Sequence, residues 1–316
     1  MADRRVVVTG CGGFVGRYLT ALLAEEGFDV WGVDVKPDVP DLPLSEYRSI
    51  DLQSKADVEK LLKDAQAGSI IHLAAQSSGG ISFRKPHETI VNNSLSVLHI
   101  LEVMRTSEAK VRLLAIGSAE VYGSVEPVDL PLVETMATRP NNPYALSKAI
   151  QEECCVLYAS VYGVDVVSTR SFNHTGAGRP DTFVLSSFAR QVVEIKKGKR
   201  EPVVNVGNID VKRDFSDVRD VSRAYVLLLD GGESGQVYNV CSGTSRSLRE
   251  ILERLAELAG IKLRIEVDKE RLRAADIKEL RGDASRLIAA TGWQPSIPFD
   301  DTLQSLLDEW DARLSQ

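Results

Sequence analysis

The chain is poor in the residues that hold metals and form disulfides, with only four histidines and four cysteines among 316 residues. No two histidines have the HxxxH spacing of a metal site, and no two cysteines form a CxxC pair. Cys154 and Cys155 are adjacent in an apparent helix, which is typical of small core residues. We therefore expect structural thiols at these positions and at Cys11 and Cys241, and no metal site.

Long apolar runs and excess positive charge are also lacking. No run approaches the roughly 20 apolar residues that span a bilayer, and the first ten residues, MADRRVVVTG, lack the pattern of a signal peptide. The net charge of −7 argues against affinity for nucleic acid through neutralisation of phosphates. We expect a cytoplasmic protein that binds neither membranes nor nucleic acid.

Short β-branched runs that alternate with helical patterns are plentiful. The predicted strands cover residues 5–10, 29–34, 46–51, 69–75, 111–118 and 164–173, and residues 235–243 return to the same sheet. Amphipathic segments at 16–27, 55–65 and 91–105 lie between them. This order predicts an α/β fold, a Rossmann-type doubly wound parallel sheet, with its ligand at the carboxyl ends of the strands.

The alternation becomes irregular after Phe172 and indicates a smaller C-terminal lobe. There, short strands near 201–208 and 212–218 alternate with helices at 247–260 and 303–314. Because no repeat or flexible linker separates the two parts, we expect them to pack closely. The predicted domains are a dinucleotide-binding domain of residues 1–171 and 217–242, and a smaller lobe of residues 172–216 and 243–316.

A glycine-rich turn follows the first predicted strand. Gly10, Gly13 and Gly16 form a GxxGxxG pattern in which Gly10 permits a tight turn, Gly13 lets a diphosphate approach the backbone, and Gly16 lets helix and strand pack closely. The free N–H groups and the dipole at the start of the helix favour an anion. The turn therefore predicts a dinucleotide site.

The ends of later strands complete this predicted site. Asp34 ends the second strand, where a carboxylate binds the adenosine ribose. That carboxylate repels a 2′-phosphate and no arginine follows at Val35, which favours NAD(H), although Lys36 leaves NADP(H) open. Asp51 and Leu52 are expected beside the adenine. The other predicted cofactor contacts are Phe14 and Val15 in the turn, Leu73, Ala74, Ala75 and Gln76 near the nicotinamide ribose, and Tyr144 and Lys148.

Tyr144 and Lys148 lie four residues apart in a helical pattern and therefore share one face. A phenol has a pKa near 10, and a nearby ammonium or an oxidised nicotinamide is expected to lower that pKa by roughly 1–3 units each. Tyr144 would then act as an acid or base near neutral pH. Ser118, at the end of a strand, is expected to hydrogen-bond the same substrate oxygen.

The segments TGCGGFVG, HLAAQ, GSAEVYG, YALSK and TGWQPSIPFDDTL, together with Asp34, resemble the extended short-chain dehydrogenase/reductases that act on nucleotide sugars. The resemblance covers nearly the whole chain. It implies hydride transfer at C4 of the sugar, with Tyr144, Lys148 and Ser118 handling the proton. It also implies a homodimer that forms a four-helix bundle from residues 92–104 and 144–161, whose apolar faces are consistent with that role.

The same resemblance implies residues for the substrate in the smaller lobe. GNIDVKRDF is similar to a stretch shared by GDP-mannose 4,6-dehydratases and GDP-4-keto-6-deoxy-mannose reductases, and it implies that Arg213 binds the substrate diphosphate. Arg273 lies where the GDP-mannose branch has an Arg-Pro-x-Glu pattern that binds phosphate and ribose. Asp276 replaces the Glu of that pattern. SFNHTGAGRP is more similar to the reductases and implies that Asn173 contacts the sugar or its diphosphate, while His174 is either a donor or a core residue.

Glu120 distinguishes two reactions within this resemblance. A 4,6-dehydratase needs a base near C5 and an acid near C6, and Glu120 lies at the base position, but Ala119 cannot donate a proton. A C4 reductase needs neither group. We therefore expect NAD(P)H-dependent reduction of the C4 keto group of GDP-4-keto-6-deoxy-D-mannose to GDP-D-rhamnose. The alternatives are a GDP-mannose 4,6-dehydratase, another nucleotide-sugar 4-epimerase or reductase, and a non-catalytic NAD(P)-sensing protein.

Overall fold

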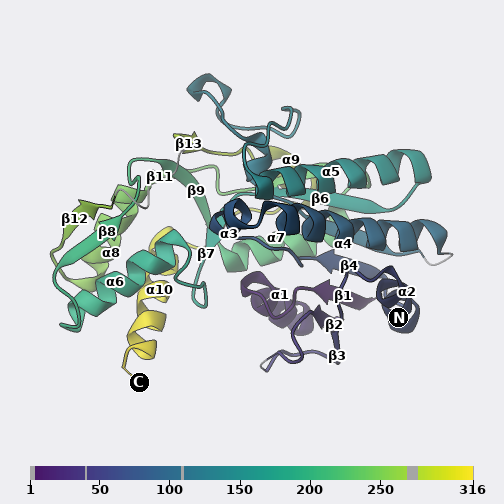
Figure 1. Cartoon of the computed structure of the whole chain (residues 1–316), viewed down its shortest axis with the longest axis horizontal. Coiled ribbons are helices and arrows are strands. Elements are labelled where there is room, and N and C mark those ends of the chain that lie inside the picture. Colours follow the sequence, from purple (N-terminus) through teal and green to yellow (C-terminus); the bar gives the residue numbers. More distant parts are fainter. Residues whose placement is uncertain (1–3, 40, 108–109, 269–276, 316) are drawn as a thin grey trace.

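The computed structural model describes residues 4–39, 41–107, 110–268 and 277–315. Its larger part is built on a seven-stranded parallel sheet in the order β10-β6-β5-β4-β1-β2-β3 (Figure 1). The strands are β1 (Arg5–Thr9), β2 (Asp29–Asp34), β3 (Glu46–Ser49), β4 (Ser69–His72), β5 (Arg112–Ile116), β6 (Val166–Ser171) and β10 (Val237–Val240). The predicted doubly wound sheet is confirmed, and each of its seven strands coincides with a predicted run.

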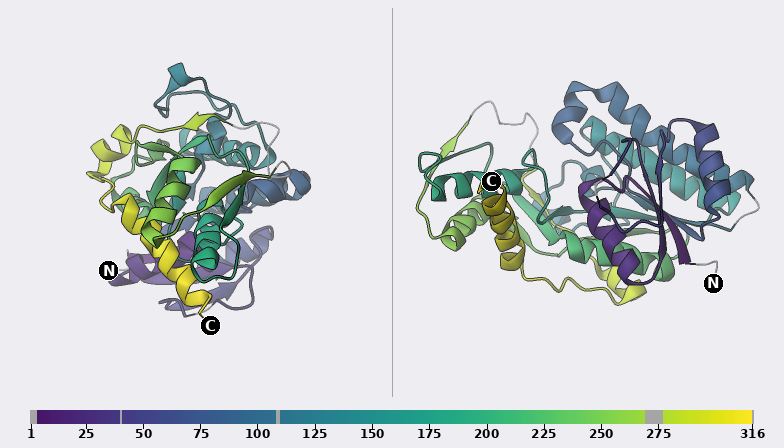
Figure 2. Two further views of the ribbon diagram at one scale, coloured as in Figure 1. Left: turned by 90° about the vertical axis from the view of Figure 1, so that its left-hand side faces the viewer. Right: turned by 90° about the horizontal axis from the view of Figure 1, so that it is seen from below.

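Helices cover both faces of this sheet (Figures 1 and 2). Because side chains alternate along a strand, Val6 and Val8 pack toward α1 and α7, whereas Val7 packs toward α2, α4 and α5. Burial on both faces explains why the strands read as continuous apolar runs. The helices of this part are α1 (Phe14–Glu25), α2 (Lys55–Ala65), α3 (Gly79–Arg84), α4 (Pro86–Thr106), α5 (Pro143–Tyr162), α7 (Val218–Gly231) and α9 (Ser285–Thr291).

The order of the strands reverses at β1. This strand pairs with β2 on one side and with β4 on the other, because the chain runs outward to β3 and then returns through α2. In sheets of this kind the ligand binds outside the carboxyl ends of the strands at the reversal point. The turns after β1 and β4 are therefore the expected centre of a binding site.

The smaller part has its own hydrophobic core between α6, α8 and α10, and Trp310 contributes to it. The helix α6 has no counterpart among the predicted segments, although its buried residues follow helical spacing. The elements are β7 (Asn173–Thr175), β8 (Val203–Val206), β9 (Lys212–Asp217), β11 (Ser245–Ser247), β12 (Arg264–Val267), β13 (Glu279–Leu280), α6 (Val184–Lys196), α8 (Leu248–Ala259) and α10 (Phe299–Arg313). Two short 3-10 turns, η2 (Ala119–Tyr122) and η3 (Pro127–Asp129), lie in the loop after β5.

Helix α9 and Trp293, the second residue after its end, pack with the large sheet, although their stretch of sequence was expected in the smaller lobe. Leu287 and Trp293 lie in the core formed with α1 and α7, and the Trp293 indole donates to the Asp220 carbonyl at 2.9 Å. The chain thus returns to the sheet after leaving the smaller lobe. The division into two domains stays a prediction. Across the described ranges, no helix is long and apolar enough to cross a membrane.

Candidate active site

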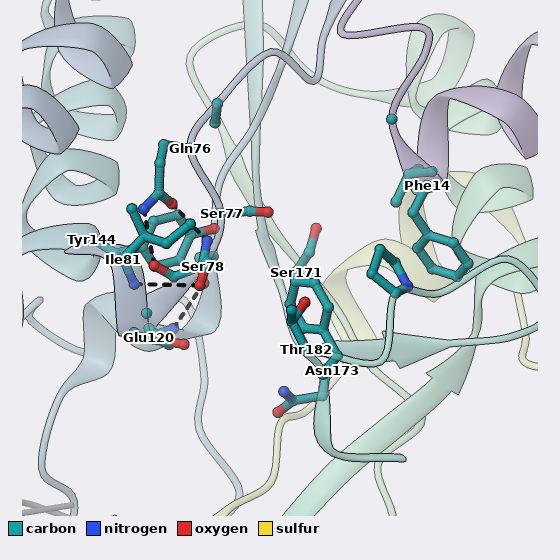
Figure 3. Close-up of a pocket in the computed structure, with 18 of the residues that line it drawn as sticks. Phe14, Gln76, Ser77, Ser78, Ile81, Glu120, Tyr144, Ser171, Asn173 and Thr182 are labelled. Atoms are coloured by element: carbon teal, nitrogen blue, oxygen red, sulfur yellow. Dashed lines mark hydrogen bonds between the residues drawn. The ribbon is translucent and has the colours of Figure 1, made fainter. Parts of the chain in front are cut away.

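A cavity of about 1440 Å³ lies at the carboxyl ends of the sheet strands and continues along the smaller lobe. Figure 3 shows Tyr144 and Glu120 on one side of it and Phe14, Ser171 and Asn173 on the other. Every predicted site residue within the described ranges lines this cavity. Arg273 and Asp276 lie outside the described residues.

The glycine turn between β1 and α1 leaves no room for side chains. Gly10 has a φ of +70°, and a Cβ there would lie 2.9 Å from the Cα of Ala74. A Cβ on Gly16 would overlap the Cys11 carbonyl group. Helix α1 starts after Gly13, and no side chain caps its first turn. The first N–H groups of the helix therefore face the cavity. This turn fits the diphosphate of a dinucleotide.

Asp34 closes the far side of this turn. Its Oδ2 accepts the Gly12 N–H at 3.1 Å and its Oδ1 accepts the Lys36 N–H at 3.3 Å. These bonds fix the carboxylate at the edge of the cavity, and lone pairs remain for ribose hydroxyls. Asp51 and Leu52 follow β3 on the same cavity wall. The arrangement fits the adenosine half of the predicted cofactor.

The segment from Leu73 to Gln76, after β4, is fixed by a residue that the sequence analysis did not select. The buried Asn93 on α4 accepts the Gln76 N–H through Oδ1 at 2.8 Å, and its Nδ2 donates to the Gln76 carbonyl at 3.1 Å and to Ser147 Oγ at 3.0 Å. Asn93 therefore connects the segment to both α4 and α5. The only signal in the sequence is an amide within an otherwise amphipathic helix.

Tyr144 is placed by the start of α5. Asn142 caps this helix by accepting the Ala145 N–H at 2.8 Å, and the next turn buries Tyr144 against Ser118, which hydrogen-bonds the phenol. Burial raises the pKa of Tyr144 well above its ordinary value, and the Glu120 carboxylate raises it further. In the protein without its cofactor the pKa of Tyr144 is therefore raised, because desolvation outweighs the hydrogen bond from Ser118. Its lowering by an oxidised nicotinamide stays a prediction.

Lys148 is 3% exposed, and its ammonium points to the end of β5. Nζ donates to the Ile116 carbonyl at 2.8 Å and to Gln151 Oε1 at 2.9 Å. Burial lowers the pKa of Lys148 to about 8. Tyr144 and Lys148 thus lie on one face of α5, and both are buried. Gln151, absent from the predicted site, is the partner that holds the ammonium.

Glu120 is held beside Tyr144 rather than free in a loop. Asn142 donates to its Oε2 at 3.0 Å, and the Glu120 N–H donates to Ser118 Oγ at 3.2 Å. Ala119, in the same turn, is 1% exposed and packs in a hydrophobic cluster. The turn therefore presents the Glu120 carboxylate to the cavity, and Ala119 next to it has no group that could donate a proton.

The smaller lobe contributes its side chains from β7 and β9. Asn173 pairs in register with Phe215 of β9 and is exposed at the cavity wall. Arg213 on β9 donates to the Ile277 carbonyl at 2.7 Å and the Lys212 carbonyl at 2.8 Å. These contacts orient the guanidinium at the wall, where the sequence predicts the substrate diphosphate.

His174 is a packed ring rather than an exposed donor. It lies parallel to the Phe14 ring with 6.3 Å between centroids, and its Nδ1 donates to the Phe172 carbonyl at 3.0 Å. Burial, followed by the charge of Arg179, lowers the pKa of His174 to about 4, so the ring is neutral at physiological pH. Arg179 also lines the cavity and was not selected from the sequence.

No metal is needed to explain the polar groups of the site. Within the part of the chain that the structure describes, no three His, Cys, Asp or Glu residues gather as ligands for an ion. The four cysteines are free thiols. The cavity wall presents the Tyr144 phenol, the Lys148 ammonium, the Ser118 hydroxyl and the Glu120 carboxylate.

Comparison with known proteins gives matches along the whole chain. A sequence profile described as GDP-mannose 4,6 dehydratase matches residues 7–306. A GDP-6-deoxy-D-mannose reductase of Pseudomonas aeruginosa is 39% identical over 313 residues, which is 99% of both chains. A GDP-mannose 4,6 dehydratase of Arabidopsis thaliana is 29% identical over 96% of this chain and 88% of its own length. The solved structure of RMD from Pseudomonas aeruginosa complexed with NADPH has a TM-score of 0.87 at 37% identity, covering 98% of this chain and all of that one.

Proposed function

This chain belongs to the GDP-mannose 4,6-dehydratase family, and from that premise we propose that it is an NAD(P)H-dependent reductase. Its substrate is GDP-4-keto-6-deoxy-D-mannose, and reduction of the C4 keto group gives GDP-D-rhamnose. The observation that carries this proposal is the 39% identity to a GDP-6-deoxy-D-mannose reductase along 99% of both chains. The geometry of the cavity also supports it.

Tyr144 is suited to donate the proton that a keto reduction consumes. When bound, the reduced nicotinamide supplies the hydride for the carbonyl carbon. Because burial and the Glu120 carboxylate hold the Tyr144 pKa above its ordinary value, the phenol keeps its proton at neutral pH and can give it to the carbonyl oxygen. Ser118, which hydrogen-bonds the phenol, also stabilises that oxygen as negative charge develops on it.

Other residues hold the two ligands. Lys148 binds the nicotinamide ribose through the ammonium that Gln151 and Ile116 keep in place. Arg213 binds the diphosphate of the GDP-sugar and Asn173 contacts its sugar, and Arg273 and Asp276 remain predictions for a phosphate and the ribose. Asp34 binds the adenosine ribose and favours NADH, although the NADPH complex of a relative supports NADPH as well.

The second candidate is a GDP-mannose 4,6-dehydratase, and Glu120 is the observation that favours it. Its carboxylate lies close enough to Tyr144 to raise the phenol pKa, as a C5 base would. The buried Ala119 argues against dehydration, because this reaction also needs an acid to expel the C6 hydroxyl. The amide contact with Asn142 instead gives Glu120 a role in positioning the start of α5.

Incubation of the enzyme with the keto sugar and either NADH or NADPH tests the proposal directly. We expect one equivalent of reduced cofactor to be oxidised for each GDP-D-rhamnose formed, and no change when GDP-mannose replaces the keto sugar. Turnover of GDP-mannose without net oxidation or reduction of the cofactor would instead identify a dehydratase. The ratio of kcat/KM for the two cofactors measures the preference that Asp34 sets.

Glu120→Gln is expected to keep keto-sugar reduction within about threefold at neutral pH, because the proton donor Tyr144 remains in place. Loss of the carboxylate charge lowers the Tyr144 pKa, so the alkaline limb of the kcat profile moves to lower pH. The pH dependence of kcat measures both effects. Glu126→Gln, at the exposed residue before the turn η3, is the matched control. A hundredfold loss of reduction would contradict this positioning role.

The outer face of α5 supports a homodimer. Five large apolar side chains on α5 are 37% or more exposed, and they lie on the helix that packs beside α4 (Figure 1). They are Leu146, Val156, Leu157, Val161 and Tyr162. We propose that they form a four-helix bundle with a second copy, in a protein located in the cytoplasm. Sedimentation is expected to give twice the mass of one chain, and Leu157→Asp is expected to shift the particle toward the monomer.

A further inference from the structure

Arg179 is a cation in the cavity wall, and no side chain or carbonyl in the described part of the chain accepts a hydrogen bond from its Nε. Its guanidinium lies 4.7 Å from the centroid of the Phe14 ring and 3.6 Å from that of Phe183. The Nε atom is buried, and among the described residues none forms an ion pair with the guanidinium. An arginine that contacts two aromatic rings in this way is oriented by them without being neutralised.

The loop that carries Arg179 is held from both sides of the cavity. Tyr18 of α1 donates to the Ala177 carbonyl at 2.7 Å, and Glu309 of α10 accepts the Gly178 N–H. Ser186 donates to the Arg179 carbonyl at 2.6 Å and itself accepts from the Trp310 indole at 3.0 Å. The backbone on both sides of Arg179 is thus fixed, so its side chain is presented to the cavity by the fold.

The titratable groups that act on Arg179 carry no negative charge at neutral pH. Tyr144 and Tyr225 have pKa values raised by burial and stay as neutral phenols, and His174 is neutral because its pKa is lowered to about 4. Burial lowers the pKa of Arg179 itself to about 10. A partly desolvated cation without a counter-charge is unfavourable in the protein alone, and an anionic ligand would compensate it.

We propose that Arg179 binds the diphosphate of the dinucleotide, at the phosphate nearer the nicotinamide. One neighbour, Phe14, is the first residue of α1, whose N–H groups face the diphosphate site. On its other side Arg179 acts electrostatically on Tyr144, which lies at the nicotinamide end. A guanidinium between these two residues reaches the phosphate that joins the two halves of the cofactor. This inference rests on the proposed binding of NAD(P)(H).

Calorimetry with fragments of the cofactor tests the assignment. In Arg179→Gln we expect the Kd of NAD(P)H and of ADP-ribose to rise at least about tenfold, since a charge-assisted contact is lost. The Kd values of AMP, which lacks the second phosphate, and of GDP are expected to change less than about twofold. Arg179→Lys keeps the charge but not the planar guanidinium. Its Kd for NAD(P)H and ADP-ribose is expected to lie between those of the wild type and Arg179→Gln.

Arg17→Gln is the matched control, because it removes an exposed arginine from the first turns of α1 outside the cavity. Its ADP-ribose affinity is expected to match that of the wild type. Unchanged ADP-ribose binding in Arg179→Gln would overturn the proposal, as would weakened GDP binding or an equal loss of AMP binding. If Arg179→Gln does not fold, by circular dichroism, the lysine variant decides. A wild type that binds ADP-ribose but does not reduce the keto sugar would refute the proposed reaction and leave this assignment standing.

Discussion

Tyr144→Phe is expected to lower kcat for keto-sugar reduction by about 10³-fold, within the range that general acids contribute, while the Kd of NAD(P)H changes little. The substitution removes the phenol that Ser118 hydrogen-bonds at the cavity wall and keeps the ring that packs at the start of α5. Without the donor, the developing alkoxide must take its proton from water. Single-turnover kinetics with the reduced cofactor already bound measure the chemical step by itself.

Tyr122→Phe is the matched control for this loss. Tyr122 is also a buried phenol with its pKa raised, to about 12, and it lies in the turn after Ser118 but not in the cavity wall. Its hydroxyl donates to Asn239 Oδ1 at 2.7 Å, so removal should cost about 1 kcal/mol of stability without slowing the chemical step. A Tyr144→Phe enzyme with more than a tenth of wild-type kcat would show that the proton has another source.

Lys148→Met is expected to inactivate the enzyme. The same substitution is expected to stabilise the ligand-free protein against unfolding. Burial lowers the pKa of Lys148 from 10.5 to about 8, which corresponds to about 3 kcal/mol of unfavourable free energy for the charged form at neutral pH. The variant loses the bonds from Nζ, about 1–2 kcal/mol, but Gln151 Nε2 still donates to the Ile116 carbonyl at 3.0 Å. The net expectation is stabilisation by about 1–2 kcal/mol, with Tm raised by a few degrees.

The pH dependence of this stabilisation identifies its cause. The folded protein releases the Lys148 proton at a lower pH than the unfolded chain, so wild-type stability from this group rises with pH between about 8 and 10.5. The advantage of Lys148→Met should therefore shrink across that window. Urea unfolding at pH 7 and pH 9.5 measures the difference, with Lys63→Met on the exposed side of α2 as the control. An advantage that does not depend on pH would mean that packing of the methionine, rather than loss of a buried charge, stabilises the variant.

The strands of the sheet could be predicted from the sequence because the pattern that identifies each strand lies within the strand itself. Each parallel strand is buried on both faces and therefore appears as an apolar run, and the turn from Gly10 to Gly16 has a spacing that few other structures need. The segment around Trp293 was not assigned to the sheet, because its packing partner Asp220 is more than seventy residues away. Long-range contacts of this kind leave no periodic pattern in a sequence.

The role of a site residue could be predicted from the sequence where the type of the residue determines that role. It could not be predicted where the role depends on neighbouring residues. Spacing placed Tyr144 and Lys148 on one helix face, but it could not show that Gln151 would turn the ammonium toward Ile116. Nor could it show that burial would raise the Tyr144 pKa, since desolvation depends on the packing of several segments. The sequence likewise could not single out Arg179, because its contacts with the Phe14 and Phe183 rings depend on the folded structure.

The loop held by Tyr18 and Glu309 also limits how the molecule can move. Its hydrogen bonds connect the loop to α1 through Tyr18 and to α10 through Glu309. Separating the two lobes would therefore break at least one of these two bonds. Each such bond contributes about 1 kcal/mol, and together they disfavour a wide hinge opening. Ligands would then enter and leave through rearrangement of side chains at the mouth, while the distance between cofactor and substrate stays set by the backbone.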